Sequence, residues 1–129
     1  MTEALYPAVT GDLARMRRQL APQVARSFHD FSQAAFAEGA LSTKTKHLIA
    51  VAVAHVTQCP YCIRGHTRAA LREGSSGEEL MEAIWVAAEM RAGAAFAHSL
   101  LAIAEIEDSK SEPVDGRQSA IEGQGNHAH

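Results

Sequence analysis

Residues 59–66 read CPYCIRGH and contain both cysteines of the 129-residue chain. Cys62 follows Cys59 by three positions, and His66 follows Cys62 by four. Because an α-helix turns about 100° per residue, side chains at this spacing lie within an arc of roughly 60° on one helix face. If the segment is helical, it places two sulfurs and an imidazole side by side.

The start of this predicted helix favours a reactive thiol. Pro60 suits the first turn, where a missing backbone N–H breaks no hydrogen bond, and Cys59 is then the expected N-cap residue. Unpaired backbone N–H groups and the positive end of the helix dipole lower the pKa of a thiol there. The motif therefore predicts a thiolate in the pair Cys59 and Cys62.

The composition indicates one globular domain without a nucleic-acid surface. Apolar residues make up 47% of the chain, the formal net charge is −3, and the pI is near 6.1. No apolar run reaches the roughly 18–20 residues that cross a bilayer, and the N-terminus lacks a signal-peptide pattern. We therefore expect a cytoplasmic protein with no membrane partner. In that compartment a cysteine pair indicates redox or metal chemistry rather than a structural disulfide.

Hydrophobic periodicity predicts an all-α fold. Capping signals mark the helix starts, among them Thr10, Ser42 and the capping box from Ser76 to Glu79. The expected helices span 10–20, 22–39, 42–56, 59–74 and 76–106.

The last predicted helix and the segment after it carry two further expectations. Gly93 predicts either a break in that helix or a closely packed neighbour. From Glu107 onward the sequence is polar and poor in hydrophobes. We expect one helical domain over residues 1–106 and a disordered tail over residues 107–129.

Other interpretations of the cysteine pair fit less well. A c-type haem site needs histidine directly after the second cysteine, where this chain has Ile63, and a thioredoxin-like motif needs a preceding strand. Zinc needs about four ligands, and three ligands crowded onto one helix are awkward for a tetrahedron. An inert pair of buried small side chains is a further alternative. Thiol redox chemistry is the favoured interpretation.

The middle of the chain resembles a known family. Residues 46–101 are similar to the alkyl hydroperoxidase D (AhpD)-like branch of the carboxymuconolactone decarboxylase superfamily. The resemblance rests on the apolar helix Leu48–Val56, the run CPYC with His66, and the glutamate-rich cap before an alanine-rich helix. The decarboxylases generally lack the cysteine pair, which favours the peroxidase-like branch. The resemblance implies an all-α fold in obligate trimers or hexamers.

The resemblance also implies a role for each residue of the motif. Carried over from the family, Cys62 is the thiolate that attacks the peroxide, His66 is its base, and Cys59 resolves the sulfenic acid to a disulfide. Helical spacing independently supports a contact between Cys62 and His66. It leaves open which sulfur attacks, because Cys59 at the N-cap is activated as well.

Two positions depart from the family pattern. Where the family commonly has a glutamate upstream of the first cysteine, this chain has His47, and Tyr61 stands where a second histidine sometimes lies. Glu89 is the alternative carboxylate, since its apolar surroundings require a partner. We therefore hypothesise a network of His47, Glu89 and His66. The competing interpretation pairs Glu89 with Arg91 or with another basic residue on the surface.

These features predict a thiol-dependent hydroperoxide or disulfide reductase that acts in antioxidant defence without a cofactor or a metal. Its expected partners are a hydroperoxide, a dithiol or lipoyl-type reductant, and further copies of itself. One alternative is a redox sensor or adaptor, which would undergo a single stoichiometric oxidation. Another is a decarboxylase-like lyase, which would stay active after alkylation of both cysteines.

Overall fold

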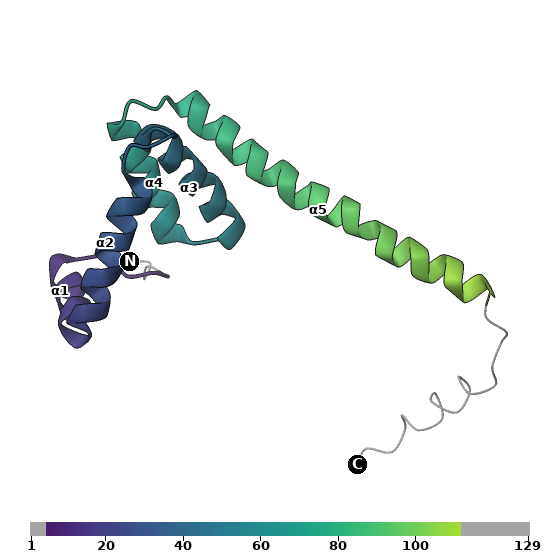
Figure 1. The fold of residues 1–129 in the computed structure, drawn as a ribbon, viewed down its shortest axis with the longest axis horizontal. Coiled ribbons are helices and arrows are strands. Elements are labelled where there is room, and N and C mark those ends of the chain that lie inside the picture. The colour runs from purple at the N-terminus through teal and green to yellow at the C-terminus, as the bar shows by residue number, and fades with distance from the viewer. Residues whose placement is uncertain (1–4, 112–129) are drawn as a thin grey trace, which may run out of the picture.

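The computed structural model describes residues 5–111, and all regular structure in that range is α-helical. The all-α prediction is confirmed for this part of the chain. Its helices, shown in Figure 1, are α1 (Gly11–Leu20), α2 (Pro22–Phe36), α3 (Thr43–Thr57), α4 (Pro60–Arg72) and α5 (Gly77–Ser111).

Polar side chains start three of the helices where the sequence predicts. Thr10 Oγ1 accepts a hydrogen bond from the Leu13 N–H at 3.3 Å, and the Ser42 hydroxyl caps α3 in the same way. Ser76 and Glu79 form a reciprocal capping box at α5, with both hydrogen bonds at 3.0 Å. These bonds satisfy N–H groups that helix geometry leaves unpaired.

A left-handed residue joins α3 to α4. Gln58 has φ 58° and ψ 46°, and its N–H returns to the Ala54 carbonyl. The Cys59 N–H reaches the same carbonyl at 3.2 Å. This turn ends α3 and leaves Cys59 as the N-cap of α4 with Pro60 in the first turn, as predicted.

The end of α2 comes before the predicted Gly39. The Thr43 hydroxyl donates to the Phe36 carbonyl at 2.9 Å, and the Lys46 ammonium donates to the Ala37 carbonyl at 2.6 Å. These side chains of α3 satisfy carbonyls that the end of a helix leaves unpaired. The same two bonds tie the end of α2 to the start of α3.

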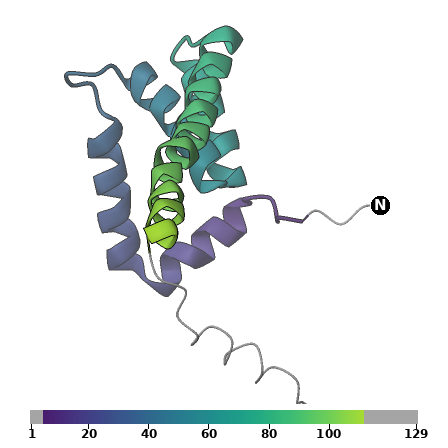
Figure 2. The same cartoon turned by 90° about the vertical axis from the view of Figure 1, so that its right-hand side faces the viewer.

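The core lies where α3, α4 and the first half of α5 meet. Val51 and Ala70 are fully buried, Leu80 is 6% exposed, and Leu48 and Ile84 pack against these three side chains. Figures 1 and 2 show α5 beginning beside α3 and α4 and then leaving them. The core therefore holds together the three helices that surround the cysteine motif.

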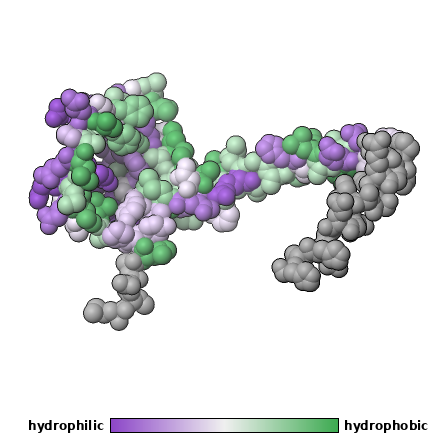
Figure 3. All heavy atoms as spheres, turned by 90° about the horizontal axis from the view of Figure 1, so that it is seen from below, coloured by the Kyte–Doolittle hydropathy of each residue, from purple (hydrophilic) through white to green (hydrophobic). Residues whose placement is uncertain are grey.

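The long helix α5 continues beyond this core without a break and projects as an arm (Figure 3). A Cβ at Gly93 would meet only Glu89 of the same helix, with its Oε1 at 3.3 Å. Gly93 therefore neither breaks α5 nor packs against another element within residues 5–111. Residues 107–111, the first five of the predicted tail, are helical and belong to α5. The remainder of that tail, residues 112–129, lies outside the described residues.

The helices α1 and α2 form a hairpin, and its second helix contacts α3 and reaches α4 through the ring of Phe36. Neither helix of the hairpin contains a buried residue. In Figure 1 the hairpin and the far half of α5 extend from the α3–α4 body in different directions. None of the helices in residues 5–111 combines the length and the apolar character needed to span a membrane.

Candidate active site

The two cysteines meet at the N-terminus of α4. Cys59 Sγ accepts a hydrogen bond from the Cys62 N–H at 3.3 Å, and the two sulfurs are 2.7 Å apart. Both cysteines are free thiols, with Cys59 half-buried and Cys62 exposed. The predicted N-cap geometry of the pair is therefore present.

The local hydrogen bonds shift the pKa values of the two thiols in opposite directions. The Cys62 thiol and the Cys62 and Tyr61 backbone N–H groups lower the pKa of Cys59 by stabilising its thiolate. The hydrogen bond to Cys59 raises the pKa of Cys62, and burial adds to this increase. Either thiol can supply the hydrogen of the contact between the sulfurs, since a thiol both donates and accepts, but the backbone N–H groups favour the thiolate at Cys59. The pair therefore carries its first negative charge on Cys59.

Two histidines from different helices meet beside the cysteine helix. His47 Nδ1 on α3 and His66 Nδ1 on α4 are 3.0 Å apart. The Phe36 ring at the end of α2 stacks on both imidazoles, with centroid distances of 4.7 Å to His47 and 5.0 Å to His66. Three helices thus hold the pair of imidazoles in place.

Burial lowers the pKa of both histidines, and the charge of His66 lowers that of His47 further. Near neutral pH both rings are therefore uncharged. In a neutral pair one Nδ1 carries the hydrogen and the other accepts it. The contact consequently couples the tautomer of His66 to that of His47.

An open cavity of about 400 Å³ connects His66 to the cysteine motif. Cys62 and His66 both line it, together with the polar side chain of Lys46. The rest of its wall is mostly apolar and consists of Ala35, Phe36, Ile49, Ala50, Val53, Ala54 and Thr57. A small molecule with an apolar group could therefore approach the Cys62 sulfur and the His66 ring together.

The structure brings together four of the five side chains that the sequence singled out. Cys59 and Cys62 are adjacent, His47 contacts His66, and Cys62 shares a cavity with His66. Within residues 5–111 no hydrogen bond joins Cys62 to His66.

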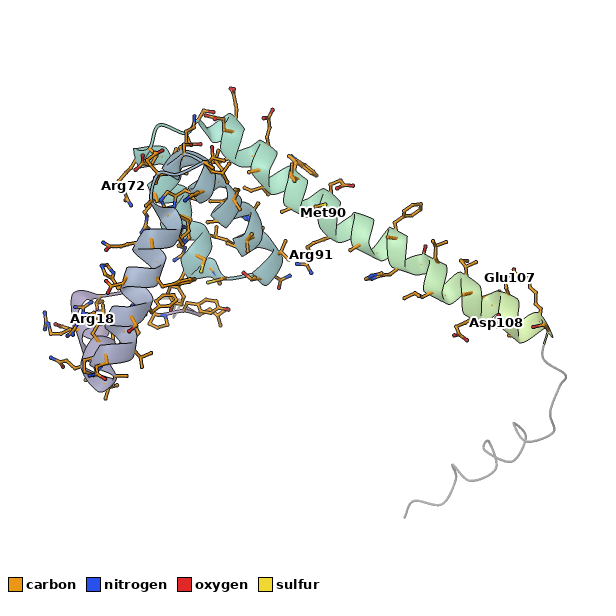
Figure 4. The ribbon with its side chains drawn as sticks, in the orientation of Figure 1. Arg18, Arg72, Met90, Arg91, Glu107 and Asp108 are labelled. Carbon is orange, nitrogen blue, oxygen red and sulfur yellow. The ribbon has the colours of Figure 1, made fainter. Side chains whose placement is uncertain are left out.

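Glu89 stands apart from this group. Its side chain is exposed on α5, and no hydrogen bond or ion pair links it to either histidine or to Arg91 among the described residues. Arg91 instead donates to the Val56 carbonyl at 3.2 Å, and Figure 4 shows it pointing from α5 toward the other helices. The direct contact of His47 with His66 takes the place of the hypothesised network through Glu89.

Sequence analysis did not identify the contacts that Phe36, Lys46 and the N-terminal segment make at the site. The periodicity of α2 marks Phe36 only as an apolar position. Tyr61, between the two cysteines, donates a hydrogen bond to the Pro7 carbonyl at 2.7 Å, and Tyr6 packs edge-on against its ring at 5.8 Å. The residues next to a position in the sequence do not indicate such contacts between distant segments.

The described ligand-type side chains do not assemble into a metal site. Among residues 5–111 no three His, Cys, Asp or Glu side chains are grouped so that they could hold an ion. The cysteines and histidines instead form two separate pairs.

Comparison with known proteins identifies the family. The model of the Carboxymuconolactone decarboxylase family matches residues 22–105, from the start of α2 almost to the end of α5. The chain belongs to this family. The match includes the cysteine pair, both histidines and Phe36.

Two uncharacterised proteins are similar to this chain in sequence. The uncharacterised protein 4 in the cox locus of Paracoccus denitrificans is 61% identical over 82 residues, which cover 64% of this chain and 74% of that protein. An uncharacterised protein of Cupriavidus necator is 36% identical over 75 residues, which cover 58% of this chain and 66% of that protein.

Solved structures show the same fold. A carboxymuconolactone decarboxylase family protein from Legionella pneumophila superposes with a TM-score of 0.57 at 39% identity, covering 61% of this chain and 70% of that chain. A protein from Methanobacterium thermoautotrophicum gives a TM-score of 0.61 at 40% identity, covering 64% of this chain and 93% of that chain. The family fold is thus present in this chain.

Proposed function

We propose that the protein is a thiol-dependent hydroperoxide reductase of the AhpD-like branch of its family. The observation that carries the proposal is the pair of sulfurs at the N-terminus of α4, with Cys62 and His66 opening on one cavity. These side chains supply a nucleophile, a resolving thiol and a proton carrier, which are the groups that peroxide reduction requires. The apolar wall of the cavity suits an organic hydroperoxide.

The reaction begins with a proton transfer inside the cysteine pair. The Cys59 thiolate takes the proton of the Cys62 thiol, which leaves the negative charge on the sulfur that faces the cavity. Cys62 then attacks the terminal oxygen of R–O–OH, so that an S–O bond forms, the O–O bond breaks and R–O⁻ leaves. The alkoxide takes a proton that His66 relays from solvent and becomes R–OH.

Cys59 completes the oxidative half of the cycle. Its sulfur attacks the sulfenic acid on Cys62, the S–S bond forms, and water leaves with the hydroxyl oxygen and the thiol proton. The dithiol loses two electrons, and one peroxide becomes one alcohol and one water. The sulfurs start 2.7 Å apart, and a disulfide bond is about 2.05 Å long, so closure requires only a small movement.

An external dithiol returns the pair to its reduced form. A dithiol such as a lipoyl-type carrier attacks the disulfide, passes through a mixed disulfide and leaves oxidised, while Cys59 and Cys62 regain their protons. The sulfur of Cys62 is the accessible point of attack, because its residue is exposed while Cys59 is half-buried.

His47 is a positioning residue in this scheme. It occupies the position of the glutamate that the family commonly has, and its contact with His66 Nδ1 fixes which nitrogen of His66 carries the proton. An uncharged imidazole in place of a carboxylate keeps this part of the site neutral.

Turnover of an organic hydroperoxide with excess dihydrolipoamide tests the proposal. We expect many cycles per chain for the wild type, no sustained turnover for Cys62→Ser or Cys59→Ser, and a loss of about 100-fold for His66→Gln. His55→Gln is the matched control, since His55 Nδ1 lies 2.7 Å from the Val51 carbonyl and does not line the cavity. A folded wild type that forms one disulfide per chain and then stops would refute the reductase and favour a redox sensor.

A lyase is the second candidate, because the family takes its name from a decarboxylase. Lys46 lines the cavity and is a cation that could hold a substrate carboxylate. Such a reaction needs no thiol, so alkylation of both cysteines separates the two candidates. A lyase keeps its rate after alkylation, whereas the proposed reductase loses all turnover.

A further inference from the structure

The cavity at the cysteine motif extends along α3. Its lining residues on that helix run from Lys46 to Thr57, and at 1.5 Å per residue this stretch is about 16 Å long. Ile49, Val53 and Thr57 follow one another at intervals of four residues, so they share one face of the helix. The cavity volume of about 400 Å³ lies within the range of small-molecule sites. The cavity can therefore hold an elongated ligand along α3.

The reactive sulfur lies toward the C-terminal end of this stretch. The Cys59 N–H is bound to the Ala54 carbonyl near the end of α3, and Cys62 follows in the first turn of α4. Helices α3 and α4 lie side by side (Figure 1), and His66 of α4 meets His47 near the start of α3. Helix α4 therefore runs back along α3, and its first turn stays at the far end of α3.

A cation lies at the opposite end of the cavity. Lys46 is half-buried in the first turn of α3, and about 12 Å of helix separates it from Ala54. Among residues 5–111, no other Lys or Arg lines the cavity, and no Asp or Glu does. Between the cation and Cys62 the wall consists of apolar side chains, including Ile49 and Val53.

The Lys46 ammonium has hydrogen-bond donors left for a ligand. One N–H donates to the Ala37 carbonyl at 2.6 Å, which leaves two of its three donors. Lys46 forms no ion pair in the part of the chain that the structure describes. The nearby Glu38 instead accepts from the Thr43 N–H at 3.1 Å. An ammonium in this setting favours a carboxylate, with which it forms a charge-assisted hydrogen bond.

We propose that the cavity binds hydroperoxides of fatty acids, with the carboxylate on Lys46, the hydrocarbon chain along α3 and the hydroperoxide group at Cys62. This assignment rests on the proposed hydroperoxide reduction and names its substrate class. The cysteine pair supplies two electrons and two protons, the O–O bond breaks, and the products are a hydroxy fatty acid, water and the disulfide. The carboxylate is unchanged in the reaction, so its contact with Lys46 serves to place the hydroperoxide at the sulfur.

Kinetics with a matched pair of substrates test the assignment. Linoleic acid hydroperoxide and its methyl ester differ in the charge that Lys46 binds, and dihydrolipoamide is the reductant. For the wild type we expect kcat/KM to be about tenfold or more higher for the acid than for the ester. Lys46→Met should lose this preference through a higher KM for the acid, whereas Lys46→Arg should retain most of it.

Lys44→Met is the matched control, because Lys44 pairs with Glu79 at 2.9 Å and does not line the cavity. We expect this variant to keep the wild-type preference for the acid. Urea denaturation shows whether each variant is folded, since Lys46 also joins α3 to the end of α2. Equal kcat/KM for acid and ester in the wild type would overturn the assignment, as would an acid preference that survives Lys46→Met.

Binding of linoleic acid itself, which lacks the hydroperoxide, separates this assignment from the peroxide chemistry. Isothermal titration calorimetry with the full chain should give a Kd about tenfold or more lower for the wild type than for Lys46→Met. If this difference is found but no hydroperoxide is turned over, the reductase is refuted and the carboxylate site at Lys46 is supported. If hydroperoxides are turned over but both proteins bind linoleic acid equally, the reductase is supported and the assigned substrate class is overturned.

Discussion

The pKa values of Cys59 and Cys62 shift in opposite directions because the two thiols make different hydrogen bonds at the start of α4. The N-cap position gives Cys59 two backbone N–H groups and the Cys62 thiol as donors, and these lower its pKa. The hydrogen bond with Cys59 and partial desolvation raise the pKa of Cys62. The negative charge is therefore favoured on Cys59, whereas Cys62 is the cysteine that lines the cavity.

This difference predicts the order of alkylation. Iodoacetamide reacts with thiolates, so Cys59 is expected to be modified first at neutral pH, although Cys62 is the more exposed residue. Its alkylation rate should rise with pH and level off below the pKa of an ordinary thiol. Peptide mapping by mass spectrometry at several pH values measures this. Preferential modification of Cys62 would contradict the assignment of the charge.

The pair of His47 and His66 predicts a loss of stability in mild acid. Burial lowers the pKa of both imidazoles below the ordinary value of 6.5. As pH falls below that value, the unfolded chain binds protons that the folded chain does not bind, and the free energy of unfolding decreases until pH reaches the lowered values. Above about pH 7 both states are neutral, and this effect is absent.

Urea denaturation between about pH 7.5 and pH 5 measures the effect. The double variant His47→Gln/His66→Gln should show a flatter pH dependence than the wild type. His55→Gln removes a histidine outside the pair and is expected to keep the wild-type slope. An equal slope in the double variant would show that the two imidazoles are not the source.

At the scale of elements, the turn at Gln58 determines where Cys59 lies. The left-handed conformation costs a residue with a side chain roughly 1–2 kcal/mol, and Gln58 adopts it with φ 58°. Gln58→Gly should therefore raise the free energy of unfolding by up to about 1 kcal/mol.

The matched variant Gln58→Val should lower the free energy of unfolding by about 1 kcal/mol, because a β-branched side chain tolerates this conformation poorly. Chemical denaturation of both variants provides the comparison. Changes of the same sign in both variants would mean that the turn does not constrain this residue.

The sequence predicted the elements better than their contacts, and the reason is the range of the interactions. The caps at Thr10, Ser42 and Cys59 depend on neighbours within one helical turn, so the local pattern reveals them. The stack of Phe36 on two imidazoles joins three helices, and helical periodicity carries no information about such a contact. The same limit explains Glu89: its apolar neighbours suggested burial, yet α5 exposes it.

At the scale of the whole molecule, most of the large hydrophobic side chains lie outside the small core. Beyond the cluster of Val51, Ala70 and Leu80, side chains such as Trp85 and Phe96 are 69% and 81% exposed. A chain that covers these surfaces by association is stabilised by mass action. The thermal unfolding midpoint should therefore rise with protein concentration, by several degrees over a hundredfold range. A midpoint independent of concentration would indicate a stable monomer.

The proposed function requires that a hydroperoxide oxidise the cysteine pair through Cys62. The most direct measurement is a single turnover with one equivalent of an organic hydroperoxide, followed by mass spectrometry of the intact protein and its peptides. We predict that the wild type converts one peroxide to alcohol and loses two hydrogens in a disulfide between Cys59 and Cys62. Cys59→Ser should stop with a sulfenic acid on Cys62. Peroxide that remains unconsumed by the folded, reduced wild type would contradict the proposed peroxide reduction. A sulfenic acid on Cys59 in the variant Cys62→Ser, together with none on Cys62 in Cys59→Ser, would contradict the assignment of Cys62 as the attacking sulfur.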